Sequence, residues 1–298
     1  MLSILIPTYN FNVYPLVTEL KNQADNLGIT FEILVQDDAS KNFLEENREI
    51  NLLQHCSYTL NHTNLGRGNN INLLNNQAKF DYVLIMEADA FPEKKTYLKD
   101  LIAAINKETI VLFGGVTYPN QEPEKDKLLR WKYGNERESV LLSERLKNPY
   151  HFVFTWNLLL KKEILSKHHF PYNVKDYGYE DVVFIKQLKE NKIPIQHIEN
   201  QLLHFNSETS KTFIEKTEKA LTTLHQLIVN KKLDLNDIKI GKAYSIITFW
   251  QLERFFCYFF EKISKKIVAN LTSSNPSLIL LDVYKLGYFC LLNQKQHV

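Results

Sequence analysis

Four short runs of mainly apolar residues, several of them β-branched, are spaced along the N-terminal part of the chain. They occupy residues 2–6, 31–35, 82–86 and 110–113. Strands that are covered by helices on both faces have continuous apolar sequences of this kind, whereas half-exposed strands alternate apolar and polar residues. Between the first two runs, apolar residues recur at helical spacing over 13–27, and Gly28 follows where a helix would end. This alternation predicts an α/β fold with a mostly parallel sheet flanked by helices.

The composition is that of a globular protein rather than a disordered or nucleic-acid-binding one. Of the 298 residues, 44% are hydrophobic and 23% are charged, which is enough to bury a sizeable core. The formal net charge is only +2. A nearly neutral chain does not bind nucleic acid through charge alone, so an anionic partner would have to be held by local residues.

We expect a cytoplasmic protein. The first residues, Met1 to Pro7, have no basic leader, and no segment reaches the roughly 18 apolar residues of a membrane span. The three cysteines, Cys56, Cys257 and Cys290, are far apart and match neither a disulfide framework nor a zinc site.

Polar side chains follow three of the predicted strands, at the point where each strand ends. Thr8 follows the first run, Asp38 and Ser40 follow the second, and Glu87 and Asp89 follow the third. In a parallel sheet, ligands bind beyond the carboxyl ends of the strands. Paired carboxylates there would hold a divalent cation against phosphate oxygens. For Asp38 or Ser40 alone, capping of a helix is an equally good interpretation, but the three strand ends together favour a nucleotide and metal site.

A long connection, residues 115–150, contains the segment from Arg130 to Gly134, in which aromatic and cationic residues are mixed. This mixture suits a mobile binding loop, with Trp131 as a lid or acceptor contact. A solvated, charged helix is the alternative.

The C-terminal part of the chain is predicted to be helical. Apolar residues recur at helical spacing over 209–230, and another helix is expected to begin near Ala243. Residues 243–260 are dense in aromatic side chains and are treated as one helix. Three lysines follow them, Lys262, Lys265 and Lys266.

Three contacts suit this aromatic helix: an anionic membrane surface, where a lipid-linked acceptor would be found, the rest of the chain, or a second subunit in a homodimer. We favour packing or dimerisation, because Glu253 and Arg254 interrupt the apolar face only mildly and the basic cluster is small.

Several of these segments, taken in order, resemble the motifs of the family 2 glycosyltransferases, which use nucleotide sugars and have the GT-A fold. The matching segments are 4–10, 35–40, 64–70, 86–89, 177–182 and 203–204. They resemble, in turn, the opening strand and turn, a second strand end, an Asn-x-Gly segment, the Asp-x-Asp motif, the Glu-Asp motif and a late histidine. The resemblance covers roughly residues 2–225 in the expected order.

This resemblance implies transfer of a sugar from a nucleoside diphosphate sugar, with UDP-sugar favoured, to an acceptor hydroxyl with inversion at the anomeric carbon. Mn²⁺ or Mg²⁺ would act as a Lewis acid on the leaving diphosphate, with Asp89 as its best ligand. His204 would complete the metal shell, although a lone histidine is often a hydrogen-bonded structural residue. Glu87 stands where the family usually has aspartate, and its longer side chain would reach the ribose or the metal.

The resemblance also assigns residues to the sugar and to proton transfer. Asp181 resembles the catalytic base of the family; the alternative is that it and Glu180 only favour a helix N-terminus. Glu180 and Tyr179 are expected to contact the donor sugar or the acceptor, and Gly178 to let the backbone approach a sugar. Asn157 is expected to line the sugar pocket, or else to form a turn.

Three residues are assigned to the nucleotide. Thr8 and Asp38 match positions that hold the base and ribose in relatives. Arg67 would meet the base or a phosphate, because a guanidinium suits a pyrophosphate geometrically, unless it is simply solvated.

We therefore expect a GT-A catalytic domain over 1–230, with a donor half at about 1–114 and an acceptor half at about 115–230, and a C-terminal helical extension over 231–298. The expected function is addition of one sugar at a time to a glycan or lipid-linked acceptor in cell-surface polysaccharide or lipopolysaccharide assembly, in the cytoplasm or at the inner face of the membrane.

Two rival functions are retained. A sugar nucleotidyltransferase would carry a glycine-rich basic loop directly after the first strand, where this chain has Pro7 to Asn10. A catalytically idle relative that binds glycan or serves as a scaffold is the other rival, against which Asp89 and Asp181 argue.

Overall fold

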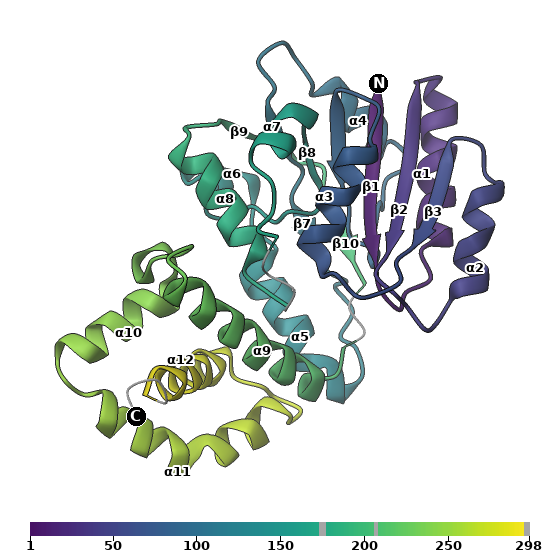
Figure 1. The fold of residues 1–298 in the computed structure, drawn as a ribbon. Helices are drawn as coiled ribbons and strands as arrows, with labels where there is room; N and C mark the ends of the chain where they lie inside the picture. Colours follow the sequence, from purple (N-terminus) through teal and green to yellow (C-terminus); the bar gives the residue numbers. More distant parts are fainter. Residues whose placement is uncertain (173–176, 206–207, 295–298) are drawn as a thin grey trace. The chain divides into compact units, whose positions relative to one another are not determined.

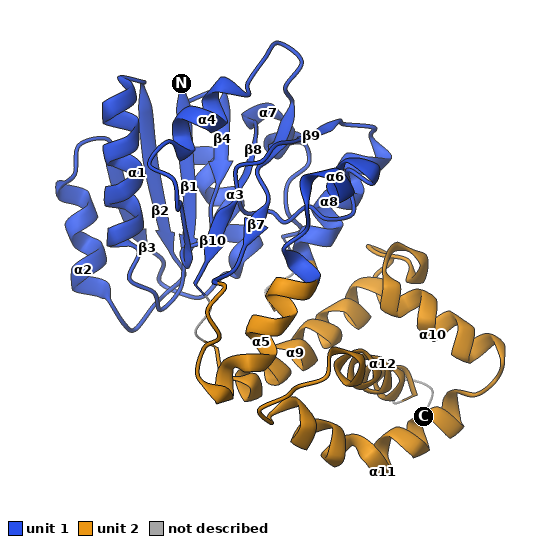
Figure 2. Ribbon diagram, turned by 180° about the vertical axis from the view of Figure 1, so that it is seen from behind, with its two compact units in different colours: residues 1–119, 137–175, 180–205 blue, residues 120–136, 176–179, 206–298 orange. Residues whose placement is uncertain are grey.

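The computed structural model describes residues 1–172, 177–205 and 208–294, and the chain divides into two compact units. Unit 1 comprises residues 1–119, 137–175 and 180–205, and unit 2 comprises residues 120–136, 176–179 and 206–298 (Figure 2). Each unit has its own hydrophobic core.

Unit 1 is built on a seven-stranded sheet with helices on both faces (Figure 1). The strands, in order across the sheet, are β3 (Cys56–Leu60), β2 (Phe31–Asp37), β1 (Leu2–Thr8), β4 (Tyr82–Ile85), β8 (Leu158–Lys161), β6 (Val111–Phe113) and β9 (Ile195–His197). All of them run parallel except β8, which is antiparallel to β4 and β6. The carboxyl ends of β1, β2, β4 and β6 therefore lie at one edge of the sheet.

The four apolar runs form β1, β2, β4 and β6, which confirms the predicted α/β fold with a mostly parallel sheet. Alternate residues of β1 enter two different cores. Ile4 and Ile6 face α1 (Tyr14–Leu27) and α4 (Tyr97–Ala103), whereas Leu5 faces α3 (Arg67–Gln77), α7 (Lys162–Lys167) and α8 (Glu180–Glu190). Because both faces are covered, consecutive positions of the strand are apolar.

The remaining short helices of unit 1 are α2 (Leu44–Arg48), the 3₁₀ helix η1 (Glu49–Leu52) and α6 (Leu142–Lys147). Helix α1 ends as predicted, because Gly28 has a left-handed conformation with φ of 62°.

A second, three-stranded sheet lies in unit 1 and consists of β5 (Ala90–Phe91), β10 (Leu202–His204) and β7 (Val116–Thr117). Strand β10 is antiparallel to β5, with His204 opposite Ala90. Since Ala90 directly follows Asp89, this pairing brings the late histidine to the acidic tripeptide, more than a hundred residues away in sequence.

The connection 115–150 is mostly helical rather than irregular. It contains β7, the 3₁₀ helix η2 (Lys125–Lys127), α5 (Leu128–Tyr133), a π-helical turn (Gly134–Glu138) and α6. The segment is helical, as the alternative in the sequence analysis held, but α5 is not a solvated helix, because Leu128, Leu129 and Arg130 are buried.

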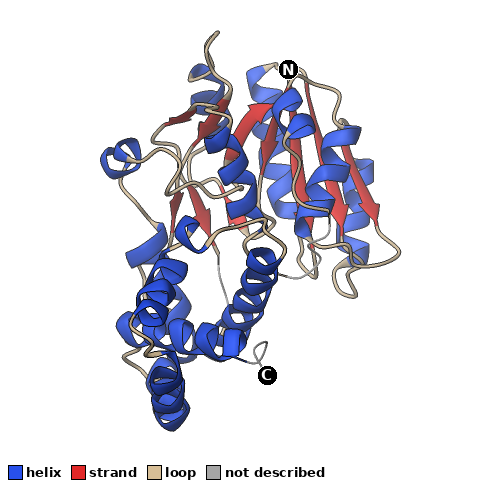
Figure 3. Cartoon of the chain, turned by 60° about the vertical axis from the view of Figure 1, so that its left-hand side comes forward, coloured by secondary structure: helices blue, strands red, loops and turns tan. Residues whose placement is uncertain are grey.

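The regular structure in the described part of unit 2 is all helical (Figure 3). Its elements are α5 and η2, then α9 (Ser210–Val229), the 3₁₀ helix η4 (Leu235–Asp237), α10 (Lys239–Phe249), α11 (Glu253–Leu271) and α12 (Leu278–Gln294). Leu129 of α5, Ile214 of α9 and Leu281 of α12 share one core. Because α9 and α5 pack with the C-terminal helices, the helical unit begins before residue 231, at 206, and also takes in 120–136.

The aromatic segment 243–260 forms two helices, so the prediction of one helix is wrong. Helix α10 ends at Phe249 and α11 begins at Glu253, and Gln251 between them has a positive φ of 57°. A non-glycine residue in this conformation cannot continue a right-handed helix. Among the residues described, none of the helices has the length and apolar character needed to cross a bilayer.

Candidate active site

Two buried polar atoms lie at the edge where the nucleotide was expected. Thr8 at the end of β1 is 3% exposed, and Asn70 in the first turns of α3 is 1% exposed. Within the described part of the chain, neither Oγ1 of Thr8 nor Nδ2 of Asn70 has a hydrogen-bond partner. A buried polar group without a partner costs stability, so its presence often indicates a ligand-binding position.

Asp38 fixes the turn that opens α3. Its buried carboxylate accepts hydrogen bonds from the backbone N–H groups of Leu65 (2.7 Å) and Gly66 (2.9 Å), and from the amide of Asn61 (3.2 Å). Asp38 therefore holds the residue that precedes Arg67. Asp38 does not cap α2, the next helix in sequence.

Arg67 connects three segments that are distant in sequence. Its guanidinium donates to Glu87 (Nε to Oε2, 3.1 Å) and to both the hydroxyl (2.9 Å) and the carbonyl (3.0 Å) of Thr155. It also lies 3.8 Å from a carboxylate oxygen of Glu180. The alternative that Arg67 is simply solvated is thereby excluded.

Burial and neighbouring charges shift the pKa values of the ionisable groups in this cluster. Burial, reinforced by the charge of neighbouring Asp181, raises the pKa of Glu180 to about 7. Burial also raises the pKa of Asp181, although Arg67 and the backbone N–H of Val182, 2.8 Å from the carboxylate, oppose this shift. Burial lowers the pKa of Arg67, but the nearby carboxylates outweigh that effect and raise it overall.

Asp89 and His204 meet at the pairing of β5 with β10. Nε2 of His204 is 3.3 Å from Oδ1 of Asp89. The imidazole is buried, with its ring centre 5.0 Å from that of Trp156 and 5.4 Å from that of Tyr118. In the described residues, Nδ1 of His204 has no hydrogen-bond partner.

The chemistry of these two side chains fits a divalent cation. A carboxylate and an imidazole nitrogen are suitable ligands for Mn²⁺, and Mg²⁺ commonly takes one or two carboxylates plus substrate phosphates. Across residues 1–172, 177–205 and 208–294, no group of three or more His, Cys, Asp or Glu residues is placed to hold a metal ion. The protein would thus supply few ligands, and Glu87 is directed to Arg67 rather than to Asp89.

Asn157 belongs to the scaffold behind the site. It is fully buried, and its amide donates to the carbonyls of Gly115 (2.6 Å) and Asn200 (2.9 Å) and accepts from the hydroxyl of Tyr97 (2.6 Å). Its φ of 54° is left-handed, which matches the turn-forming alternative. No surface of Asn157 is left to line a sugar pocket.

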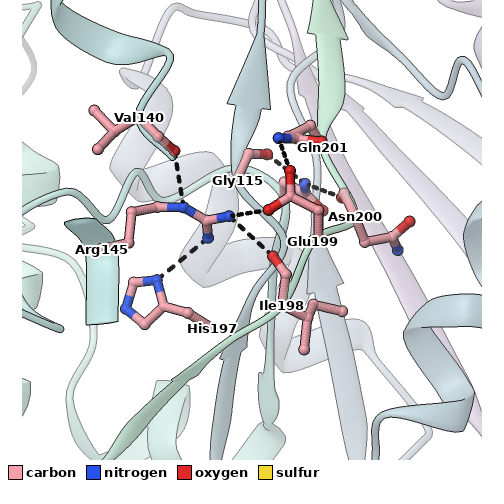
Figure 4. A network of polar contacts seen from close by, with 9 residues as sticks. Gly115, Val140, Arg145, His197, Ile198, Glu199, Asn200 and Gln201 are labelled. Atoms are coloured by element: carbon pink, nitrogen blue, oxygen red, sulfur yellow. Dashed lines mark hydrogen bonds and ion pairs between the residues drawn. The ribbon is translucent and has the colours of Figure 1, made fainter. Parts of the chain in front are cut away.

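A buried arginine supports the same scaffold (Figure 4). Arg145 is 1% exposed and donates to the carbonyls of Val140 (3.1 Å) and Ile198 (3.0 Å), with Nη1 3.3 Å from Nδ1 of His197. Burial lowers the pKa of His197, the hydrogen bond to the carbonyl of Pro149 opposes this shift, and the adjacent Arg145 adds to it. A neutral His197 accepts from Arg145 through Nδ1 and donates through Nε2 to the carbonyl of Pro149 (2.8 Å). This network fixes the segment that leads into β10 and His204.

The two predicted sugar contacts outside unit 1 are Trp131 on α5 and Tyr179, which belong to unit 2. Their contacts with a sugar stay predictions. The glycine beside Tyr179 has a different task from the one expected. A Cβ at Gly178 would lie 2.6 Å from Cβ of Ala220, and the φ of Gly178 is 104°, so the glycine permits close approach to α9.

Sequence reasoning missed several residues of the site. Thr155 holds the guanidinium of Arg67, Trp156 and Tyr118 enclose His204, and Asn70 has the unpartnered amide. Thr155, Trp156 and Tyr118 stand in no chemical motif. The one available signal was for Asn70, which lies in the Asn-x-Gly segment.

Comparison with known proteins identifies the family of this chain. A family model described as Glycosyl transferase family 2 matches residues 3–168, which is more than half of the chain. No sequence among the curated proteins matches the chain at a significant level.

Several solved structures share the fold. S. aureus TarS 1–349 in complex with UDP-GlcNAc has a TM-score of 0.50 and 19% identity, over 99% of this chain and 92% of that chain. The mannosyltransferase PcManGT from Pyrobaculum calidifontis, in complex with GDP-Man and Mn²⁺, has a TM-score of 0.55 and 13% identity, over 98% and 87% of the two chains. Mannosyl-3-phosphoglycerate synthase from Rubrobacter xylanophilus has a TM-score of 0.52 and 14% identity, over 78% and 74%.

At these identities the structural likeness shows the fold alone. The chain corresponds to 39% of the length of a longer TarS structure. The family assignment rests on the match over residues 3–168. The chain belongs to glycosyl transferase family 2 and is a glycosyltransferase with the GT-A type of fold.

Proposed function

We propose that this glycosyltransferase moves one sugar at a time from a nucleoside diphosphate sugar to an acceptor hydroxyl, with inversion and with help from a divalent cation. The observation that carries the proposal is the position of Arg67. It pairs with Glu87, two residues before the candidate metal ligand Asp89, and lies beside Glu180, the neighbour of the candidate base Asp181. The guanidinium of Arg67 thus contacts both the Glu87–Asp89 segment, proposed to bind the diphosphate, and the Glu180–Asp181 pair, proposed to transfer the proton.

The donor would bind at the carboxyl ends of β1, β2 and β4. The buried, unpartnered Oγ1 of Thr8 supports a nucleotide contact there. Asp38 would act on the nucleotide together with the turn that it fixes. Arg67 would turn from Glu87 to the diphosphate when the donor binds, because a guanidinium matches phosphate oxygens in a bidentate manner. Glu87 would then be released to contact the ribose.

The choice of a UDP-sugar over a GDP-sugar is part of the proposal. Fold neighbours bind donors of both kinds, since one was solved with UDP-GlcNAc and another with GDP-Man and Mn²⁺.

Asp89 and His204 would hold Mn²⁺ or Mg²⁺ in our proposal. The 3.3 Å separation of Oδ1 of Asp89 and Nε2 of His204 supports this assignment. A bound cation supplies Lewis-acid stabilisation of the charge that develops on the leaving diphosphate. Burial between Trp156 and Tyr118 orients the imidazole and keeps bulk water away from it.

Asp181 would accept the proton of the acceptor hydroxyl while the hydroxyl oxygen attacks the anomeric carbon and the bond to the diphosphate breaks. A carboxylate whose pKa is raised by burial is a stronger base than one in water. Glu180, the second carboxyl group of the Glu180–Asp181 pair, would contact the donor sugar or the acceptor. Because the two carboxylates interact, they would titrate in separate steps.

Trp131 and Tyr179 are proposed as contacts of the sugar or the acceptor, which would be a glycan or a lipid-linked glycan. Assembly of a cell-surface polysaccharide or lipopolysaccharide in the cytoplasm is the proposed context. The two rivals, nucleotidyl transfer and an idle scaffold, have no specific support in the geometry of the site.

Two variants test the proposal. Asp181→Asn should keep the affinity for the nucleotide sugar and lose turnover, because the amide cannot accept the hydroxyl proton. Asp89→Ala should lose the metal-dependent part of nucleotide-sugar binding, measured as the thermal shift with and without Mn²⁺. Normal rates with Asp181→Asn would overturn the base assignment, and release of pyrophosphate from a nucleoside triphosphate would favour the nucleotidyltransferase.

A further inference from the structure

Large apolar side chains are exposed where α10 meets α11. Six residues that we call the aromatic corner are each between 50% and 77% exposed: Phe249, Trp250, Leu252, Phe255, Tyr258 and Phe259. The break between the helices at Gln251 separates the first two residues from the others. Monomeric soluble proteins rarely expose contiguous apolar patches of this kind, so the aromatic corner indicates a surface that another body covers.

The aromatic corner continues along one face of α11 as a row of lysines. Phe255, Tyr258 and Phe259 are followed at helical spacing by Lys262 and Lys266, which are also exposed. Nζ of Lys262 lies 5.3 Å from the centre of the Tyr258 ring. One exposed face of this helix is thus aromatic in its first half and basic in its second.

The opposite face of α11 is already engaged within unit 2. Cys257, Phe260 and Ile267 are buried, and the ring of Phe260 lies 5.5 Å from that of Tyr284 on α12. A Cβ at Gly287 of α12 would lie 2.2 Å from the Phe260 ring, so the glycine permits the close packing of these helices. The core of unit 2 therefore fixes which side of α11 is presented outward.

Residues 239–266, which include the aromatic corner and the lysines of α11, are more basic than the rest of the protein. Residues 239–266 contain six basic and two acidic side chains, a formal charge of +4, whereas the whole chain carries only +2. One of the two acids, Glu253, accepts a hydrogen bond from the Tyr244 hydroxyl (2.7 Å) and is partly buried. The remaining 270 residues together carry a charge of −2, so an anionic partner would be attracted to this segment in particular.

We propose that the aromatic corner and the lysines of α11 bind the surface of an anionic lipid bilayer. Tryptophan, tyrosine and phenylalanine enter the boundary between headgroups and acyl chains, and lysines pair with anionic headgroups. The sequence alone favoured packing or dimerisation, but the aromatic side chains are exposed. A symmetric contact with a second copy would bring two such basic faces together, which like-charge repulsion disfavours.

Flotation of the full-length protein with lipid vesicles tests the proposal. Vesicles of phosphatidylcholine mixed with phosphatidylglycerol should carry the protein upward, and vesicles of phosphatidylcholine alone should not. Replacing Lys262, Lys265 and Lys266 together by glutamine should weaken binding on the order of 100-fold, and high salt should do the same. Phe255→Ser combined with Phe259→Ser should also reduce flotation by more than tenfold.

Two matched controls replace exposed residues of the same kinds elsewhere in unit 2. Ile279→Ser removes an exposed apolar side chain from α12, and Lys231→Gln with Lys232→Gln removes exposed charges from the segment after α9. Both should float like the wild type, and far-ultraviolet circular dichroism should show that all variants are folded.

Equal flotation with neutral and anionic vesicles, or unchanged flotation of the aromatic variant, would overturn the proposal. A dimer in light scattering that Phe255→Ser converts to a monomer, without vesicle binding by the wild type, would assign the surface to a second copy instead. Since flotation needs neither donor nor turnover, its failure is distinguishable from failure of the proposed glycosyl transfer.

Discussion

Replacing Glu180 by glutamine should change how the stability of the protein depends on pH. Burial raises the pKa of this carboxyl from 4.5 to about 7 in the folded chain. The folded state therefore holds the Glu180 proton more tightly than the unfolded state. Its contribution to stability is fully present below pH 4.5 and is lost as the pH rises through about 7.

The size of the effect follows from the same pKa. At about 1.4 kcal/mol per pH unit, a rise from 4.5 to about 7 corresponds to a loss of about 3 kcal/mol between those pH values. Glutamine resembles the neutral acid in shape and does not ionise. Glu180→Gln should therefore match the wild type near pH 4.5 and exceed its free energy of unfolding by up to about 3 kcal/mol at pH 8.

Urea unfolding of the ligand-free protein at several pH values, followed by tryptophan fluorescence, measures this difference. Glu93→Gln is a matched control, because Glu93 is exposed and its replacement should leave the stability nearly unchanged at each pH. If the difference in unfolding free energy between wild type and Glu180→Gln were the same at pH 4.5 and pH 8, the electrostatic account of Glu180 would be refuted.

Three further substitutions, one of them with a matched control, test the scaffold. Asn157→Ala should lower the free energy of unfolding, measured by chemical denaturation, by about 3 kcal/mol. The buried Tyr97 hydroxyl and the carbonyls of Gly115 and Asn200 would each lose their hydrogen bond to Asn157. Gly178→Ala should raise the rate of amide exchange in α9 and lower the free energy of unfolding by about 2 kcal/mol, because the new Cβ would lie 2.6 Å from Cβ of Ala220. Gly28→Ala is the matched control: a Cβ at Gly28 meets no atom within 4 Å, so only the left-handed φ should lower the free energy of unfolding, by about 1 kcal/mol. Asp38→Ala should raise KM for the nucleotide sugar more than it lowers kcat, since two backbone hydrogen bonds of the turn before Arg67 are lost. An unchanged KM there would contradict the positioning function of Asp38.

The strands and first helix were predictable because their signals are local. Each of the four apolar runs forms a strand of unit 1. Both faces of the sheet are covered by helices, so these strands do not alternate apolar and polar residues. The break at Gln251 was not predictable. The residues around it include neither glycine nor proline, and a positive φ at glutamine is set by packing rather than by propensity.

The site residues that lie in sequence motifs were predictable, whereas contacts between residues distant in sequence were not. Glu87 and Asp89 stood out because paired carboxylates directly follow a buried strand, and Glu180 and Asp181 stood out because their segment resembles the Glu-Asp motif of the family. The pairing of Arg67 with Glu87 and Thr155 joins segments up to 88 residues apart, and no spacing rule reports such a contact. Asn157 looked like a pocket residue only because its neighbours in three dimensions were unknown.

The sequence by itself determined the fold class, the strands β1, β2, β4 and β6, the helix α1 and the family, because apolar periodicity and ordered motifs are properties of neighbouring residues. Only the tertiary structure decided which candidates work together. Sheet pairing sets His204 against Asp89, burial raises the pKa of Glu180 and Asp181, and the core of unit 2 leaves the aromatic corner exposed. These properties arise from long-range contacts and from exclusion of water, which depend on the whole packed chain.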